Sequence, residues 1–249
     1  MPFLGNKKAT TKRLNFIFSK HQNCFDPSIF ETYIRTLIMS EKLKHIAISG
    51  NIGSGKTTLA QMLAKHYGWT ALIESVDDNP YLRDFYEDMT KWAFHLQIYF
   101  LNSRFKQVNE IRGDERTTVQ DRTIYEDAYI FAANLRKSGH ISERDYQSYL
   151  DIFKSMINFV KPPDLLIYLK ADIPKLVRQI EKRGRDYEYA IRIDYLKNLN
   201  EHYQEWIGNY NEGKLLVIDV NELDFVENIE DFSAIVGKVD FELNNLFNQ

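Results

Sequence analysis

The sequence has one cysteine, Cys24, and the lack of a second thiol rules out an internal disulfide and a cysteine metal cluster. It also lacks any apolar run that approaches the roughly 20 residues needed to cross a bilayer. Basic residues are not in excess, because the formal net charge is −3 at pH 7. A dedicated nucleic-acid binder needs a basic face. We therefore expect neither a membrane nor a nucleic-acid polymer as a partner.

The first 38 residues differ from the rest of the chain in charge. Residues 1–38 carry six Lys or Arg and only two acids. Such a segment is compatible with an organelle transit peptide, which would imply a mitochondrial location. We favour an accessory tail, because the stretch from Met39 would itself make a natural beginning. The expected organisation is an N-terminal extension of uncertain role over 1–38 and one domain over 39–249, in the cytoplasm.

Short apolar runs alternate with longer segments of helical periodicity. The runs predict strands at 45–49, 71–74, 117–120, 164–169 and 214–219. The periodic segments predict helices at 55–67, 85–111, 127–138, 142–160, 173–183, 191–208 and 228–247. This alternation predicts an α/β fold, in which helices flank a five-stranded parallel sheet. Ligands bind such sheets beyond the carboxyl ends of the strands, so the residues after each strand are the candidates for a site.

A glycine-rich stretch follows the first predicted strand. Gly50, Gly55, Lys56 and Thr57 fit the pattern G-x-x-x-x-G-K-[ST]. In this pattern backbone N–H groups surround the phosphates of a nucleotide, the lysine reaches the β- and γ-phosphates, and the hydroxyl binds Mg²⁺. The candidate ATP-binding residues are Gly50, Asn51, Ile52, Gly53, Ser54, Gly55, Lys56, Thr57 and Thr58. The guanine-reading pattern N-K-x-D of a GTPase switch is missing.

A carboxylate, Glu74, ends the second predicted strand. A hydroxyl acceptor loses a proton as it attacks phosphorus, so a carboxylate at this place could act as a general base. A phosphate acceptor would instead need cations, and no Lys or Arg follows Glu74 before Arg83. The pattern therefore disfavours a nucleoside monophosphate kinase. The alternative for Glu74 alone is a solvated strand end.

Two polar residues lie on one face of the apolar helix predicted at 85–111. Gln97 and Arg104 are seven residues apart, and Phe94 shares their face. A buried amide and guanidinium need partners, and a heterocyclic base offers them. The alternative is an amphipathic core helix with both side chains at its solvated rim.

Polar residues also follow the third predicted strand. Asp121 ends that strand, Arg122 comes next, and Asp127 lies near the start of the following helix. Asp121 could take the acidic role toward Mg²⁺, and Arg122 could offset phosphate charge. Asp219, at the end of the more apolar strand 214–219, competes for the magnesium role. The pattern of residues does not decide between the two acids.

Four stretches resemble, in order, the motifs of the deoxynucleoside kinase family. They are GNIGSGKTT from Gly50, QDRTIYEDAYIFAANL from Gln120, RGRDYE from Arg183 and IDVNELDF from Ile218. The resemblance covers roughly residues 45–247 and is nearest to bacterial deoxyadenosine kinases. It implies a P-loop kinase fold with a basic lid, MgATP as the phosphate donor, and a homodimer.

The resemblance also implies a role for each site residue. Glu74 matches the general base, and Asp121 with Arg122 matches the acid toward Mg²⁺ and the arginine toward the 5′-hydroxyl and phosphate. Gln97, Arg104 and Asp127 match the residues that read the base, while Tyr86 and Glu188 match those that hold the 3′-hydroxyl. The remaining matches are with ATP: Arg183 and Arg185 with the phosphates, and Asp219, Val220 and Asn221 with the adenine.

The sequence thus predicts a kinase that phosphorylates the 5′-hydroxyl of a deoxynucleoside in nucleotide salvage. Catalysis is assigned to Glu74, Arg122 and Lys56, and the Mg²⁺ ligands are Thr57 and Asp121. Deoxyadenosine is the favoured substrate, with deoxycytidine or deoxyguanosine next. The alternatives are a nucleoside monophosphate kinase and a P-loop protein that binds a nucleotide without transferring phosphate.

Overall fold

The computed structural model describes residues 43, 45–73, 79–185, 188 and 191–247. The N-terminal extension and the predicted base Glu74 lie outside these residues. Their predicted roles therefore stay predictions.

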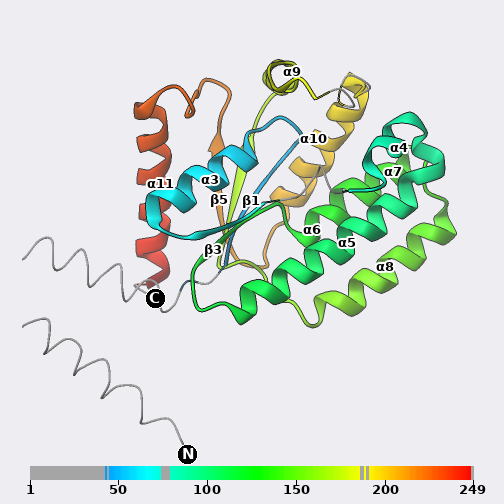
Figure 1. Ribbon diagram of the computed structural model, residues 1–249, viewed down its shortest axis with the longest axis horizontal. Helices are drawn as coiled ribbons and strands as arrows, with labels where there is room; N and C mark the ends of the chain where they lie inside the picture. Colours follow the sequence, from blue (N-terminus) through cyan, green and yellow to red (C-terminus); the bar gives the residue numbers. More distant parts are fainter. Residues whose placement is uncertain (1–42, 44, 74–78, 186–187, 189–190, 248–249) are drawn as a thin grey trace, which may run out of the picture. The chain divides into compact units, whose positions relative to one another are not determined.

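Five parallel strands form the sheet, in the order β2-β3-β1-β4-β5 (Figure 1). They are β1 His45–Gly50, β2 Thr70–Leu72, β3 Thr118–Asp121, β4 Leu165–Lys170 and β5 Lys214–Asp219. The predicted sheet is confirmed, because each of the five apolar runs forms one strand. The register pairs Ile48 with Asp121 and Gly50 with Leu169. Gly50 and Asp121 therefore lie together at the carboxyl edge of the central strands.

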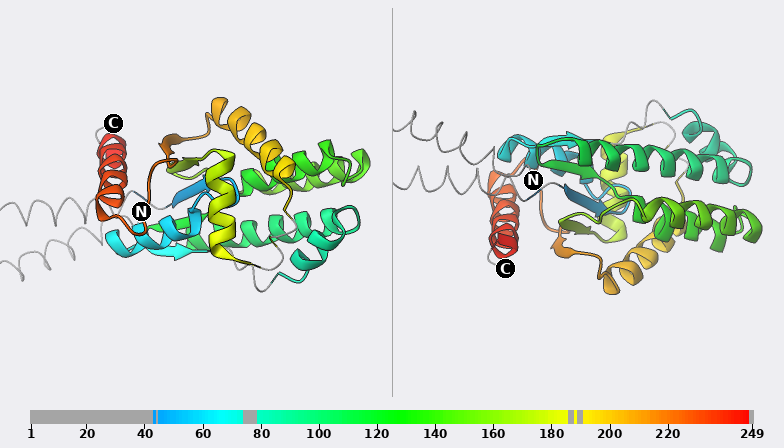
Figure 2. Two further views of the ribbon diagram at one scale, coloured as in Figure 1. Left: turned by 90° about the horizontal axis from the view of Figure 1, so that it is seen from above. Right: turned by 90° about the horizontal axis from the view of Figure 1, so that it is seen from below.

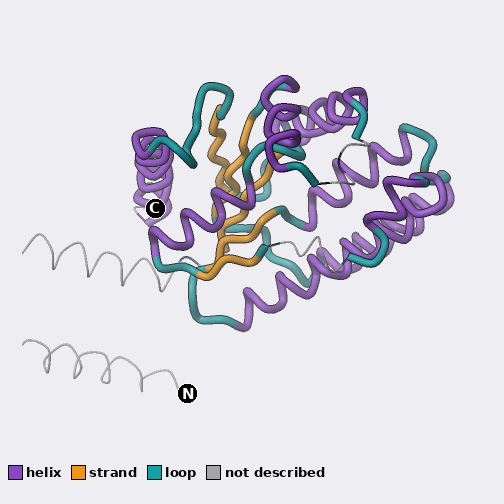
Figure 3. The backbone as a smooth tube through the Cα atoms, turned by 45° about the horizontal axis from the view of Figure 1, so that its top comes forward, coloured by secondary structure: helices purple, strands orange, loops and turns teal. Residues whose placement is uncertain are grey.

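Helices surround this sheet (Figures 1 and 3). They are α3 Lys56–Tyr67, α4 Leu82–Glu87, α5 Met89–Gly113, α6 Ile124–Glu126, the π-helix η1 Asp127–Ala132, α7 Ala133–Lys137, α8 Glu143–Ile157, α9 Ile173–Arg183, α10 Ile193–Gly208 and α11 Ile229–Phe247. Helix α3 packs against β1, β2 and β3, and α11 packs against β5. Figure 2 shows α3 and α10 on opposite faces of the sheet, while α5 and α8 extend side by side beyond it.

The three central strands of the sheet are buried on both faces, whereas the edge strands β2 and β5 are mostly half-buried. Every residue of β1 and β3 is buried, and so are the first five residues of β4. Parallel strands covered by helices on both sides are apolar along their length, and the run Leu-Leu-Ile-Tyr-Leu at 165–169 has this composition. The core therefore fixes the strand ends from which the polar residues project.

Two predicted helices differ from those observed. The segment 85–111 forms two helices, because Asp88 ends α4 and caps α5 by accepting a hydrogen bond from Lys91 N at 3.0 Å. The segment 127–138 begins with π-helical residues from Asp127 to Ala132. Such wide turns inside helices are frequent at functional sites. Here the π-helix places the buried Asp127 on an element that packs against α5.

Candidate functional site

The phosphate loop adopts backbone angles that exclude most side chains. Gly53 has φ 85° and Gly55 has φ 94°, both in the left-handed region. A Cβ on Gly53 would lie 2.7 Å from the carbonyl oxygen of Leu176 in α9. A Cβ on Gly55 would lie 2.8 Å from the ring of Phe225. The loop is therefore closely covered by α9 and by the segment after β5.

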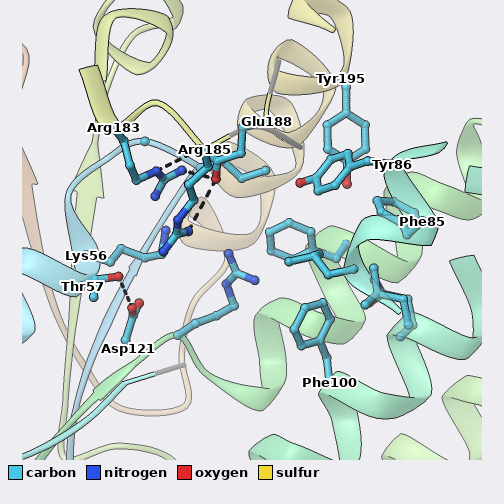
Figure 4. Close-up of a pocket in the computed structure, with 17 residues that line it drawn as sticks. Lys56, Thr57, Phe85, Tyr86, Phe100, Asp121, Arg183, Arg185, Glu188 and Tyr195 are labelled. Atoms are coloured by element: carbon cyan, nitrogen blue, oxygen red, sulfur yellow. Dashed lines mark hydrogen bonds and ion pairs between the residues drawn. The ribbon is translucent and has the colours of Figure 1, made fainter. Parts of the chain in front are cut away.

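Lys56 and Thr57 begin α3, where the positive end of the helix attracts phosphate. Lys56 is buried, and its Nζ donates to the carbonyl oxygen of Asn51 at 3.0 Å. The Thr57 hydroxyl donates to Oδ2 of Asp121 at 2.5 Å (Figure 4). These contacts join the phosphate loop to the end of β3.

Thr57 and Asp121 fit a magnesium ion. Asp121 is 3% exposed, and its Oδ1 has no hydrogen-bond partner among the described residues. A hydroxyl and a carboxylate oxygen are donors that Mg²⁺ accepts. The competing acid, Asp219, forms an ion pair with Lys170 at 3.4 Å at an exposed position. In the described part of the chain no three His, Cys, Asp or Glu side chains cluster as a metal site.

Arg122 follows Asp121 in a strained conformation. It has φ 71° and is the one non-glycine residue with positive φ among those described. Its N–H donates to the carbonyl oxygen of Ile48 at 2.9 Å, and its guanidinium lies 4.2 Å above the ring centre of Phe131. Strained residues of this kind gather at ligand-binding sites, where the surrounding structure holds them.

One pocket lies between the phosphate loop and an aromatic wall. Its lining residues are Ile52, Gly53, Lys56, Thr57, Leu82, Phe85, Tyr86, Leu96, Gln97, Phe100, Asp121, Arg122, Phe131, Arg183, Arg185, Glu188 and Tyr195. Figure 4 shows Lys56, Thr57 and Asp121 on one side, with Phe85, Tyr86 and Phe100 on the other. Gln97 is 2% exposed, and its Oε1 has no hydrogen-bond partner among the described residues. The wall thus combines ring faces for stacking with an amide that can accept a hydrogen bond.

Arg104 and Asp127 form a pair behind this wall. Arg104 is 1% exposed and Asp127 is fully buried, with Arg104 Nε 3.8 Å from Asp127 Oδ2. The alternative that Gln97 and Arg104 lie at a solvated rim is therefore wrong. Arg104 and Asp127 are not among the residues that line the pocket. Their contact with a base stays a prediction.

A chain of amides connects Arg104 to the sheet. Arg104 Nη1 and Gln120 Nε2 both donate to Oε1 of Gln107, each at 3.0 Å. Gln120 Oε1 then accepts from Nε2 of His45 at 2.8 Å. An arginine can only donate hydrogen bonds, so the Gln107 oxygen must face Arg104. The Gln120 amide then donates to the same oxygen and turns its own oxygen toward His45. Burial, the largest cause, lowers the pKa of His45 to about 4, so the imidazole is neutral at pH 7 and carries its proton on Nε2.

The lid brings two arginines to one carboxylate. Arg183 Nε and Nη2 donate to the two oxygens of Glu188 at 2.9 and 2.5 Å, and Arg185 Nη1 lies 3.6 Å from Oε1 (Figure 4). Glu188 is 5% exposed and lines the pocket together with both arginines. The structure thus gathers the lid residues predicted from the sequence. It shows them paired with each other.

The adenine loop predicted at Asp219, Val220 and Asn221 lies outside the pocket lining. Asn221 Oδ1 accepts from the backbone N of Asp172, which precedes α9. A backbone bond from Asn221, the largest cause, lowers the pKa of Asp219. The role of this loop toward ATP stays a prediction. Phe225, which follows this loop in the chain, lies against Gly55 of the phosphate loop.

Sequence reasoning missed several residues that line the pocket or support it. The apolar ones in the lining are Leu82, Phe85, Leu96, Phe100 and Phe131. Tyr195 lines the pocket from α10. Glu126 is fully buried and accepts from the hydroxyl of Tyr203 at 2.8 Å. The Thr-x-x-Glu pattern of a capping box at 123–126 was a signal for Glu126. Neither tyrosine has a local signal, because both owe their position to the packing of α10.

No described helix is both long enough and apolar enough to span a membrane.

Comparisons with known proteins agree with this geometry. The model of the protein family described as "Deoxynucleoside kinase" matches residues 46–243 of this chain. A deoxyadenosine kinase of Dictyostelium discoideum is 43% identical over 205 residues, which are 82% of this chain and 82% of that protein. A deoxyadenosine/deoxycytidine kinase of Bacillus subtilis is 38% identical over 196 residues, which are 78% of this chain and 90% of that protein. The solved structure of deoxyadenosine kinase from M. mycoides with bound dATP has a TM-score of 0.70 and 31% identity, and the match covers 79% of this chain and 99% of that one.

Proposed function

The chain belongs to the deoxynucleoside kinase family, and we propose that it transfers the γ-phosphoryl group of ATP to the 5′-hydroxyl of a deoxynucleoside, with deoxyadenosine preferred. One observation carries this proposal. The same pocket is lined by the phosphate-loop residues Lys56 and Thr57 and by the aromatic wall of Phe85, Tyr86 and Phe100 with the amide of Gln97. A donor site for a triphosphate and a cavity for a planar base therefore open into each other.

The phosphate loop and its neighbours hold the donor. Lys56 offers its charge to the β- and γ-phosphates, and the N-terminus of α3 adds its dipole. Mg²⁺ supplies charge neutralisation on these phosphates when bound. Thr57 and Asp121, 2.5 Å apart, are the residues that would hold it. Arg122 lines the same pocket and is placed to offset the charge of the transferring group.

The acceptor half positions the nucleoside. Tyr86 and Glu188 would hold the 3′-hydroxyl, and the rings of Phe100 and Phe131 would enclose the base. The resemblance assigns the proton of the 5′-hydroxyl to Glu74, whose placement is outside the described residues. Tyr86 beneath the sugar would crowd a 2′-hydroxyl, which favours deoxyribose.

The lid would close over the transferring phosphate. Arg183 and Arg185 form charge-assisted contacts with Glu188 inside the pocket, so their guanidinium groups already lie at its edge. On binding, phosphate oxygens would compete with Glu188 for these arginines. A closed lid excludes water, which would otherwise accept the phosphoryl group.

Deoxyadenosine is the preferred substrate for two reasons. Glutamine can pair with an adenine edge through two hydrogen bonds, and Gln97 faces the pocket with Oε1 available. The relatives at 43% and 38% identity are named for deoxyadenosine in both cases. Deoxycytidine and deoxyguanosine are the next candidates.

We also propose a homodimer, which rests on the family resemblance, and a cytoplasmic location, which is the location that we expect from the sequence. Sedimentation equilibrium of the purified protein tests the first. One chain has a mass of 29.4 kDa, so a measured mass of this value would contradict the homodimer. Cell fractionation tests the second, and recovery in mitochondria would contradict it.

A panel of acceptors tests the function. Phosphoryl transfer from MgATP is measured with the four common deoxynucleosides, adenosine and deoxyadenosine 5′-monophosphate, for wild type and Glu74→Gln. We expect the highest kcat/KM with deoxyadenosine and a loss of at least about 100-fold in kcat in Glu74→Gln, as removal of a general base implies. Full activity of Glu74→Gln would contradict the mechanism. Activity confined to the monophosphate would indicate a nucleoside monophosphate kinase.

A further inference from the structure

Glu126 is a buried carboxylate that joins three separate parts of the site. It is 0% exposed and lies in α6, directly after the loop that carries Arg122. Its Oε2 accepts from the backbone N of Thr123 at 2.8 Å and from the Thr123 hydroxyl at 3.2 Å. Its Oε1 accepts from the hydroxyl of Tyr203 at 2.8 Å and faces the N–H of Gly50 at 3.5 Å. Four donors from three chain segments thus converge on one side chain.

The bonds to Thr123 act on the strained residue of the pocket. Arg122 has φ 71°, and its own N–H is fixed by Ile48 O on the neighbouring strand. The next peptide N–H, that of Thr123, is fixed by Glu126. Hydrogen bonds therefore hold the backbone on both sides of Arg122. A strained conformation persists only where the surrounding contacts fix it in this way. Release of one of these bonds would let the Arg122 guanidinium leave the pocket.

The bond to Tyr203 reaches the helix that follows the lid. Tyr203 is fully buried in α10, and its ring stacks on Tyr168 of β4 with ring centres 5.8 Å apart. Burial, the largest cause, raises the pKa of Tyr203 well above its usual value, and Glu126 adds to this increase. Its hydroxyl therefore stays protonated at pH 7 and donates to Glu126.

A second contact ties α10 to the phosphate loop on the same side of the helix. Asn51 Nδ2 donates to Asn200 Oδ1 at 2.6 Å and to the carbonyl oxygen of Leu196 at 3.0 Å. Leu196, Asn200 and Tyr203 are spaced four and three residues apart, so they share one face of the helix. This face of α10 contacts the phosphate loop through Asn51 and the Arg122 loop through Glu126.

We propose that Glu126 and Tyr203 are positioning residues for phosphoryl transfer, which fix the Arg122 loop against the phosphate loop and hold both to α10, the helix that follows the lid. The inference rests on the proposed function, because it assigns Arg122 to the transferring phosphate. Neither Glu126 nor Tyr203 lines the pocket, so they act through Arg122 and Gly50. Their loss should affect the transition state more than the binding of either substrate.

The decisive variant is Tyr203→Phe, which removes one hydroxyl and leaves the buried ring in place. Tyr210→Phe is its matched control, because Tyr210 lies just after α10 and its hydroxyl has no hydrogen-bond partner among the described residues. Glu126→Gln keeps the shape of the second partner but turns an acceptor oxygen into a donor. The double variant Tyr203→Phe/Glu126→Gln tests whether the two residues act together.

For each variant kcat and both KM values are measured with deoxyadenosine and ATP, per folded molecule as determined by circular dichroism and urea unfolding. We expect kcat of Tyr203→Phe to fall about tenfold with both KM values within about twofold, as loss of an alignment effective only in the transition state implies. Tyr210→Phe should keep the wild-type kcat, and the double variant should lose no more than Glu126→Gln alone. If Glu126→Gln does not fold, Tyr203→Phe still decides the question.

An unchanged kcat in Tyr203→Phe, or an equal loss in Tyr210→Phe, would overturn the inference. A lower stability with normal kcat per folded molecule would also overturn it, because the pair would then be merely structural. A wild-type enzyme that transfers no phosphate to any nucleoside would instead overturn the proposed function. The two failures are therefore distinguishable.

Discussion

Arg183 and Glu188 form a two-point ion pair at the edge of the pocket, with donor–acceptor distances of 2.9 and 2.5 Å. The same carboxylate also lies 3.6 Å from Arg185. One residue that the resemblance assigns to the sugar thus pairs with two residues that it assigns to the phosphates, and the three side chains together keep one positive charge. Glu188 is 5% exposed, so loss of its arginine partners would leave a desolvated carboxylate without charge compensation. In the proposed mechanism, binding of phosphate by Arg183 and Arg185 therefore requires the exchange of these partners.

This exchange predicts that Glu188→Gln changes the KM values of the two substrates differently. The variant loses its charge-assisted contact with the 3′-hydroxyl, so KM for deoxyadenosine should rise about tenfold. It also frees Arg183 and Arg185 for phosphate, so KM for ATP should not rise. Asp194→Asn, which disrupts an exposed pair with Arg192 at 3.7 Å, is the control and should change neither constant. Equal increases of both KM values in Glu188→Gln would contradict this account of the lid.

The second prediction concerns Thr57 and Asp121. Asp121→Asn removes the anionic oxygen that faces the predicted Mg²⁺ position, so kcat should fall about 100-fold or more and half-saturation by Mg²⁺ should shift to higher concentration. Thr57→Ser keeps the hydroxyl and should retain a Mg²⁺ dependence close to that of wild type. The assay is a magnesium titration at saturating ATP. Loss of kcat in Asp121→Asn with an unchanged magnesium curve would contradict a role near the metal.

The third prediction uses the oxygen of Gln107 that accepts from both Arg104 and Gln120. Gln107→Met has a similar length but no acceptor, so Arg104 loses one of the contacts that orient it toward the predicted base, while its pair with Asp127 stays. We expect the ratio of kcat/KM between deoxyadenosine and deoxycytidine to change about tenfold, the effect of one hydrogen bond to a charged group. Gln61→Met, at an exposed position of α3, is the matched control. A uniform loss for all bases in Gln107→Met would argue against orientation of Arg104 as the cause.

The fourth prediction follows from the pKa of His45, which burial lowers from 6.5 to about 4. As pH falls below 6.5 the unfolded chain binds a proton that the folded chain does not yet accept, so the free energy of unfolding decreases until about pH 4. This one group should account for about 2 kcal/mol of the loss between pH 7 and pH 5.

Urea unfolding at both pH values checks this, with His45→Gln as the variant that lacks the group. His95→Gln, at an exposed position of α5, controls for the loss of a histidine. The variant His45→Gln should lose about 2 kcal/mol less than wild type between the two pH values. Parallel losses in wild type and His45→Gln would show that the histidine is not buried in its neutral form.

Most of the sheet was predictable from sequence because β1, β4 and β5 contain short apolar runs with polar residues on both sides. Strand β3, Thr-Val-Gln-Asp, is mostly polar although all four of its residues are buried. The break at Asp88 was not predictable from periodicity, since its local signal was a single capping residue. The π-helical turn at Asp127 also has no sequence signature of its own.

The donor half of the site was predictable for a similar reason. The pattern of the phosphate loop states the positions of Lys56 and Thr57 directly, and the strand end at Asp121 follows from the sheet. Glu126 and Tyr203 are 77 residues apart, and only the packing of α10 brings them together. A local pattern contains no information on such a contact, and the same holds for Gln107 and Gln120.

Competition between two acceptors tests the central claim most directly. The protein is incubated with MgATP labelled at the γ-phosphate and equal concentrations of deoxyadenosine and deoxyadenosine 5′-monophosphate, and the labelled products are separated. Our account predicts label in deoxyadenosine 5′-monophosphate. Label only in the diphosphate, or release of inorganic phosphate without transfer, would contradict it.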